Sequence, residues 1–154
     1  MRLFNTLLSI LVPTLALACF GAELRVGVPP DAGLQTYTAY SVGYYVEEKT
    51  GIAPRFVEVA DGESAILNGE IDLWLEVGED SLPRGVEERT GAAVEGLGKV
   101  TFWLNPEVLD DLRFTTVERA LARASSFLTS EQFNENAMGD NPRKSARKAA
   151  VKSD

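Results

Sequence analysis

Three short β-rich segments separated by two helical segments constrain the fold of this chain most strongly. The β-rich segments are ELRVGVPP at residues 23–30, PRFVEVA at 54–60 and EIDLWLEV at 70–77. Strands that alternate with crossover helices favour a parallel sheet with right-handed connections and helices packed on its faces. The sequence therefore predicts an α/β protein with a parallel βαβαβ sheet flanked by helices, followed by further C-terminal helices.

Both connecting segments have the residues expected at helix ends. Residues 36–51 place tyrosines at helical spacing and end at Gly51, a residue typical of helix C-termini. Asp61 precedes the second segment as a good N-cap. A tyrosine stripe at this spacing is typical of a core, and we expect Tyr37, near the helix start, to be the exception that a ligand could reach.

The second half of the chain reads mostly as helix. Residues 78–97 have a weak pattern with a possible short helix at 86–90, and residues 98–104 read as another strand. Each later helix has a start signal: Pro106, the capping-box segment TTVE at 115–118, Ser130, and Asn141-Pro142 ahead of a basic terminal helix. The basic residues of that last helix are expected to form a solvated face.

The N-terminal residues predict export. Arg2 is followed by an apolar run that is too short to span a bilayer permanently, and Ala16-Leu17-Ala18 fits a signal peptidase site. Cleavage would leave Cys19 first, and a lipid anchor on Cys19 is a second interpretation. The predicted organisation is a signal peptide at 1–18, one α/β lobe at 19–140, and a basic C-terminal helix or tail at 141–154. The predicted location is the periplasm or the outer face of the cell membrane.

Composition excludes several kinds of function. The chain has no histidine and one cysteine, which removes Ser-His-Asp triads, most transition-metal sites and an internal disulfide. Its formal net charge of −8 argues against nucleic acid and suits a cationic ligand. No phosphate-binding glycine motif follows the first strand, and the acids Glu76, Glu79 and Asp80 read as a solvated turn. We therefore expect a non-catalytic protein without cofactor or metal.

The strand at residues 71–77 carries the most distinctive chemistry. Side chains alternate along a strand, so Asp72, Trp74 and Glu76 share one face. Ligands of open parallel sheets bind beyond the carboxyl ends of the strands. Trp74 and Glu76 lie nearer to that end of the strand than Asp72 does. An aromatic face beside a carboxylate suits a quaternary ammonium ion. The alternative is that Trp74 only fills space under a helix, and Trp103, near a loop rim, is open to the same two interpretations.

These motifs carry a family resemblance. The segment GYYVEEKTGIAPRFVEVADGESAILNGEIDLWLEV, residues 43–77, resembles the first lobe of substrate-binding proteins of ABC importers for glycine betaine and related quaternary amines. A weaker likeness continues through residues 85–100, 104–112 and 130–149. The resemblance implies a periplasmic-binding-protein-like fold of type II, and Trp74 matches the family's aromatic residue at the end of that strand.

The chain also departs from that family. Such proteins have two lobes that both contribute to the site, whereas this chain passes from the first lobe, near residues 99–105, almost directly to the closing helices. We therefore expect a binding component for glycine betaine or choline-type amines that is shortened to about one lobe and binds weakly. Its candidate ligand residues are Trp74, Glu76, Tyr37 and Trp103. The expected partners are an ABC permease and, as one option, a second chain that supplies the other lobe. The alternative is an exported non-catalytic remnant or interaction module that binds no small ligand.

Overall fold

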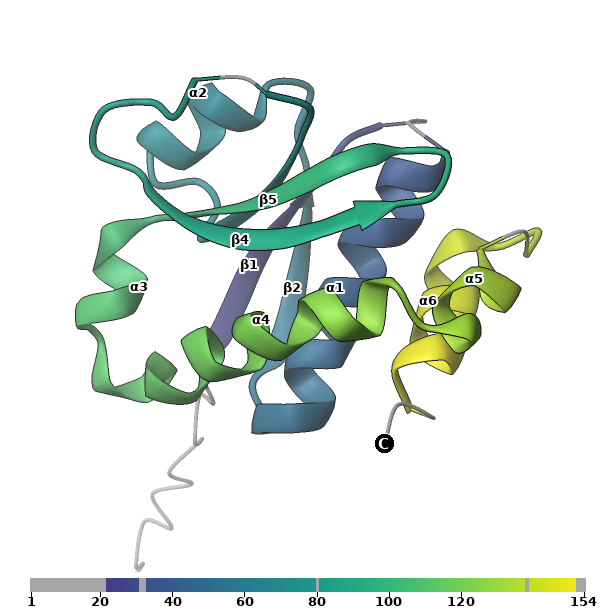
Figure 1. Cartoon of the computed structure of the whole chain (residues 1–154). Coiled ribbons are helices and arrows are strands. Elements are labelled where there is room, and N and C mark those ends of the chain that lie inside the picture. The colour runs from purple at the N-terminus through teal and green to yellow at the C-terminus, as the bar shows by residue number, and fades with distance from the viewer. Residues whose placement is uncertain (1–21, 31–32, 80, 138, 152–154) are drawn as a thin grey trace, which may run out of the picture.

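The computed structural model describes residues 22–30, 33–79, 81–137 and 139–151 (Figure 1). The expected signal peptide and Cys19 lie outside the described residues. The elements in chain order are β1 (Glu23–Val28), α1 (Leu34–Thr50), β2 (Ala53–Glu58), α2 (Gly62–Leu67), β3 (Leu73–Val77), β4 (Glu87–Val94), β5 (Gly98–Leu104), α3 (Pro106–Asp110), the 3₁₀ helix η1 (Leu112–Phe114), α4 (Thr115–Leu128), α5 (Glu131–Asn136) and α6 (Pro142–Val151). In the part of the chain that is described, no helix is both long and apolar enough to cross a membrane.

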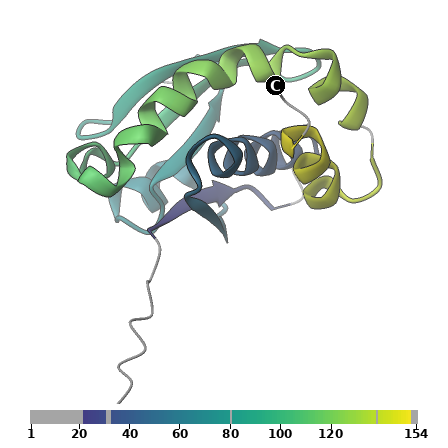
Figure 2. The same ribbon diagram turned by 90° about the horizontal axis from the view of Figure 1, so that it is seen from below.

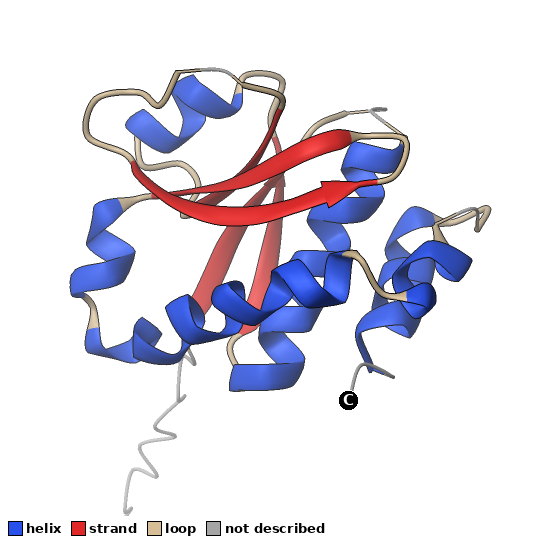
Figure 3. Ribbon diagram, in the orientation of Figure 1, coloured by secondary structure: helices blue, strands red, loops and turns tan. Residues whose placement is uncertain are grey.

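The five strands form one open mixed sheet in the order β2-β1-β3-β5-β4 (Figure 3). β1 pairs in parallel with both β2 and β3, as the βαβαβ pattern predicted. β5 runs antiparallel to both β3 and β4. The protein is therefore α/β, but the prediction of a wholly parallel sheet is wrong, because β4 and β5 enter the sheet as a hairpin and not through a crossover helix.

The short helix predicted at residues 86–90 is also wrong, because strand β4 begins at Glu87. The tight turn of the hairpin closes with a hydrogen bond from the Leu97 N–H to the Val94 carbonyl, and the backbone of Gly96 and Gly98 has positive φ. Gly91 lies so close to β5 that an added Cβ would be 2.2 Å from the Val100 carbonyl oxygen. Pairing with β5 therefore decides the conformation of this segment, whatever its local pattern favours.

The two faces of the sheet are covered differently. The main core lies between one face and the helices α1, α4, α5 and α6, and it takes Leu24 and Val26 from β1 and Leu73 and Leu75 from β3. Figure 2 shows α6 beside α1 and α4 along the hairpin. On the other face, the short helix α2 covers a smaller separate cluster that contains both tryptophans. The strand alternation predicted for residues 73–77 is confirmed, although Ile71, ahead of β3, packs with Trp74 in the smaller cluster.

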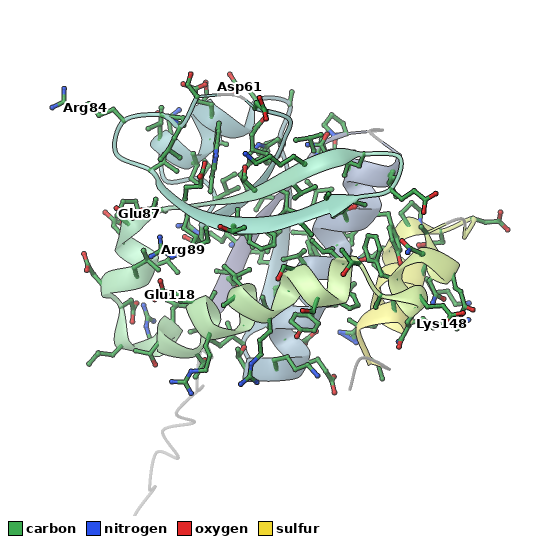
Figure 4. All side chains as sticks on the ribbon, in the orientation of Figure 1. Asp61, Arg84, Glu87, Arg89, Glu118 and Lys148 are labelled. Carbon is green, nitrogen blue, oxygen red and sulfur yellow. The ribbon has the colours of Figure 1, made fainter. Side chains whose placement is uncertain are left out.

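Most predicted helix caps are present. The Asp61 carboxylate accepts a hydrogen bond from the Ser64 N–H, Ser130 caps α5, and Gly51 closes α1 in the left-handed conformation. The capping box at residues 115–118 is wrong, because Thr115 already lies inside α4 and makes no such bond. Glu118 instead forms an ion pair with Arg89 of β4, so it joins the helix to the sheet edge (Figure 4).

The basic terminal helix α6 is packed on the domain through its small residues. Ala146, Ala149 and Ala150 are buried, whereas Lys144 and Lys148 are exposed, as expected for a solvated basic face. Arg143 lies over the Phe56 ring at 5.3 Å, and its Nε donates a hydrogen bond to the Tyr44 hydroxyl. This bond raises the pKa of Arg143. The stacking and the hydrogen bond attach α6 to α1 and β2.

A polar clamp fixes the register of β3 against β1. The Asp72 carboxylate accepts hydrogen bonds from the Arg25 backbone N–H at 2.8 Å and from the Arg25 side chain at 3.0 and 2.6 Å. The Asp72 N–H in turn donates to the Arg25 carbonyl, and the third Arg25 side-chain nitrogen, Nη1, donates to the Gly69 carbonyl. Since Asp72 is buried, these bonds replace its lost hydration.

The clamp yields the first prediction. Asp72→Ala removes the acceptor of the partly buried Arg25 N–H and the carboxylate partner of the Arg25 side chain, so it should lower the free energy of unfolding by about 2–3 kcal/mol. Urea denaturation measures this change. Asp140→Ala, at an exposed position, should alter stability by less than about 0.5 kcal/mol. An Asp72 variant as stable as the Asp140 variant would contradict the role given to the clamp.

Candidate functional site

The two tryptophans lie side by side on the α2 face of the sheet. Trp74 of β3 is directly opposite Trp103 of β5 in the antiparallel register, and residues paired in this way point to the same face. Trp74 is 6% exposed and Trp103 is 2% exposed. The sheet thus brings together two residues that are 29 positions apart in the sequence.

Two glycines make room for the Trp74 ring. An added Cβ on Gly62, the first residue of α2, would lie 2.1 Å from indole atoms, and one on Gly27 of β1 would lie 2.8 Å away. The backbone of α2 therefore rests against the indole, and β1 presents no side chain to it. In this conformation α2 covers the surface of Trp74 that would otherwise face solvent.

Glu76 holds the other end of the same indole. The Trp74 Nε1–H donates to Glu76 Oε2 at 2.8 Å, so the carboxylate both orients the ring and places negative charge beside it. Glu76 is half-buried, one residue before the end of β3. The shared face that strand alternation predicted for Trp74 and Glu76 is confirmed, and the structure adds the hydrogen bond between them. What the pair binds stays a prediction.

This pair lies at the edge of the sheet where ligands of open α/β sheets bind. The chain leaves the carboxyl end of β1 for α1 on one face and the carboxyl end of β2 for α2 on the other, so the connections diverge at the carboxyl edge of the sheet. The first turn of α1 is fixed at this edge by two hydrogen bonds. The Gln35 side chain donates to the Leu75 carbonyl, and the Thr36 hydroxyl donates to the Pro29 carbonyl.

Tyr37 does not lie with the tryptophans. It is buried in the main core on the opposite face, and its hydroxyl donates to the Phe133 carbonyl at 2.7 Å. Burial raises the pKa of Tyr37. The expectation that Tyr37 would be an exception to the buried tyrosine stripe is therefore wrong, because α5 supplies both a stacking ring and an acceptor for its hydroxyl.

Trp103 is also more enclosed than its sequence neighbours suggested. We expected it near a loop rim, but β5 continues to Leu104, and Val86 and Ile66 pack in the same cluster. Its Nε1–H has no hydrogen-bond partner among the residues that the structure describes. Of the two neighbouring indoles, one therefore has its polar atom paired and the other does not.

Glu88 is a neighbour that the sequence analysis missed. It lies directly opposite Trp103 in the β4–β5 register and is exposed. A helix at residues 86–90 would have placed it elsewhere, and only the hairpin turn at Gly96 and Gly98 could have signalled its position. The row across this face now reads Trp74, Trp103, Glu88, with Glu76 in the next row opposite Thr101.

Two arginines at the other end of the sheet already have carboxylate partners. A hollow of about 210 Å³ at the amino end of the sheet is lined by two ion pairs. Arg25 pairs with Asp72, and Arg113 pairs with Asp111. Within the described ranges, no group of three acidic or cysteine side chains is arranged to hold a metal ion. The tryptophan row therefore offers the more specific chemistry.

Comparisons of the chain with protein-family profiles, curated proteins and solved structures found no match. The functional argument therefore rests on the geometry at Trp74 and Glu76 and on the sequence resemblance of residues 43–77.

The contact between α2 and Trp74 yields the second prediction. Gly62→Ala puts a methyl group into the indole, so α2 must move outward, and the free energy of unfolding should fall by about 1–3 kcal/mol. Tryptophan emission should shift to longer wavelength as water reaches the ring. Glu63→Ala, exposed on the same helix, is the matched control and should change neither quantity appreciably. Unaltered emission and stability in the Gly62 variant would rule out the contact.

Proposed function

We propose that this chain is an extracytoplasmic solute-binding component of an ABC transporter for glycine betaine and choline-type quaternary amines, in a form reduced to about one lobe. The observation that carries the proposal is the Trp74–Glu76 pair, an indole and a carboxylate held together at the carboxyl edge of the sheet. The fold that this proposal requires is a periplasmic-binding-protein-like lobe of type II, for which the open α/β sheet is a suitable frame.

The chemistry of the pair favours this class of ligand. A quaternary ammonium ion has no N–H to donate, so it is held by aromatic faces and by nearby negative charge. Glu76 supplies that charge while its hydrogen bond keeps the Trp74 ring in place, and Glu88 adds a second carboxylate along the same face. The net charge of −8 attracts cations to the whole surface.

The proposed mechanism follows from the open sheet edge. The ligand is captured at the carboxyl ends of β1 and β3 and is then passed to a membrane permease. Full enclosure in such transporters comes from closure of two lobes, so capture by one lobe alone is weak and gains strength from a second chain. The protein acts in this role by binding and not by catalysis, at the periplasm or the outer face of the membrane.

One observation favours the second candidate, an exported interaction module that binds no small ligand. Trp74 is only 6% exposed and α2 lies on its ring, as expected if the tryptophan merely fills space. The two candidates differ in whether a quaternary amine reaches the indole.

A fluorescence titration tests the proposal and gives the third prediction. Glycine betaine should change the tryptophan emission of the wild-type chain saturably at millimolar concentrations. Glu76→Gln keeps an oxygen for the indole N–H but removes the charge, so it should weaken binding roughly tenfold. Glu95→Gln, the same change in the exposed turn of the hairpin, is the matched control and should bind like wild type.

Two results would count against the proposal. A flat wild-type response up to tens of millimolar glycine betaine and choline would leave the interaction module as the better account. Equal binding by the Glu76 and Glu95 variants would show that the site is elsewhere.

A further inference from the structure

The starting observation is the unpaired N–H of Trp103. Buried donors in folded proteins nearly always have a partner, and leaving one unpaired costs about 1–3 kcal/mol. Trp103 is 2% exposed, and among the described residues nothing accepts from its Nε1–H. The neighbouring Trp74 is different, since its Nε1–H is bound to Glu76. Within the part of the chain that the structure describes, the Trp103 N–H is therefore a donor without an acceptor.

The surroundings of Trp103 explain why no side chain serves. The other buried members of its cluster are all apolar: Val59, Ala65, Ile66, Ile71, Trp74 and Val86. The closest carboxylates by register are Glu76, which already accepts from Trp74, and Glu88, which is exposed. Among the described side chains none accepts from Trp103, so an acceptor oxygen on a ligand would satisfy its N–H.

We propose that Trp103 is the second anchor of the ligand site, and that its Nε1–H donates to a carboxylate oxygen of a zwitterionic amine. This proposal rests on the proposed function and narrows its ligand class to carboxylated quaternary amines such as glycine betaine. The ammonium group lies against Trp74 and Glu76, and the carboxylate reaches the adjacent Trp103. Simple cations lack the acceptor, and simple anions lack the ammonium group that offsets the negative charge of Glu76 and Glu88.

Access to Trp103 requires α2 to move. This helix has six residues and covers only the small cluster, which is separate from the main core beneath α1 and α4. An outward displacement of α2 therefore exposes both indoles while the main core stays packed.

Selectivity between two ligands supplies the fourth prediction. Wild-type protein should bind glycine betaine about tenfold or more tightly than tetramethylammonium, because only glycine betaine offers an acceptor to Trp103. Trp103→Phe should reduce the affinity for glycine betaine to that for tetramethylammonium, while tetramethylammonium binding stays unchanged. The unchanged ligand reports that the variant is folded. If the ratio of the affinity for glycine betaine to that for tetramethylammonium is the same in wild type and in Trp103→Phe, Trp103 is not an anchor of the ligand.

A nuclear magnetic resonance measurement on the wild-type chain avoids any effect of mutation. The protein has two tryptophans and hence two indole N–H signals, and Glu76→Gln identifies that of Trp74. Saturating glycine betaine should move the Trp103 signal downfield, and tetramethylammonium should not. A Trp103 signal that stays fixed while the Trp74 signal moves overturns the anchor and leaves the proposed function standing. No response of either signal to either ligand overturns both.

Discussion

The clamp between Arg25 and Asp72 is the interaction on which the rest of the site depends. β1 and β3 share a short parallel pairing, and the Asp72 carboxylate fixes it by accepting from both the backbone and the side chain of Arg25. A shift of one residue in this register would turn Trp74 into the main core and Leu73 and Leu75 out of it. The ion pair, in which Asp72 is the buried partner, thus fixes the position of the tryptophans as well as contributing to stability.

The second requirement is space on the α2 face. Gly27 and Gly62 lack side chains where the Trp74 ring lies, and the ring then shares a small cluster with Trp103 apart from the main core. This division gives the domain a larger core under α1 and α4 and a smaller cluster covered by a six-residue helix. Under the proposed function, a ligand that displaced α2 would meet two indoles and two carboxylates, which is the chemistry that a betaine needs.

Local signals in the sequence were sufficient for the first part of the fold. Strand alternation and the caps Asp61 and Gly51 located β1 to β3 and their helices, and alternation placed Trp74 and Glu76 on one face. The position of β4 could not be predicted in this way, because Gly91 and the pairing with β5 are non-local and outweigh the local pattern. Because β4 was not predicted, neither the position of Glu88 opposite Trp103 nor the burial of Trp103 could be predicted. Tyr37 was misjudged since its acceptor, the Phe133 carbonyl, lies 96 residues away.

The central claim is that a quaternary ammonium group lies against the Trp74 indole. Intermolecular nuclear Overhauser effects between the N-methyl protons of glycine betaine and the protein test this most directly. The account predicts cross-peaks to the ring protons of Trp74, with Trp103 next in intensity. Cross-peaks confined to other surfaces, or none under conditions where glycine betaine is bound, would contradict it.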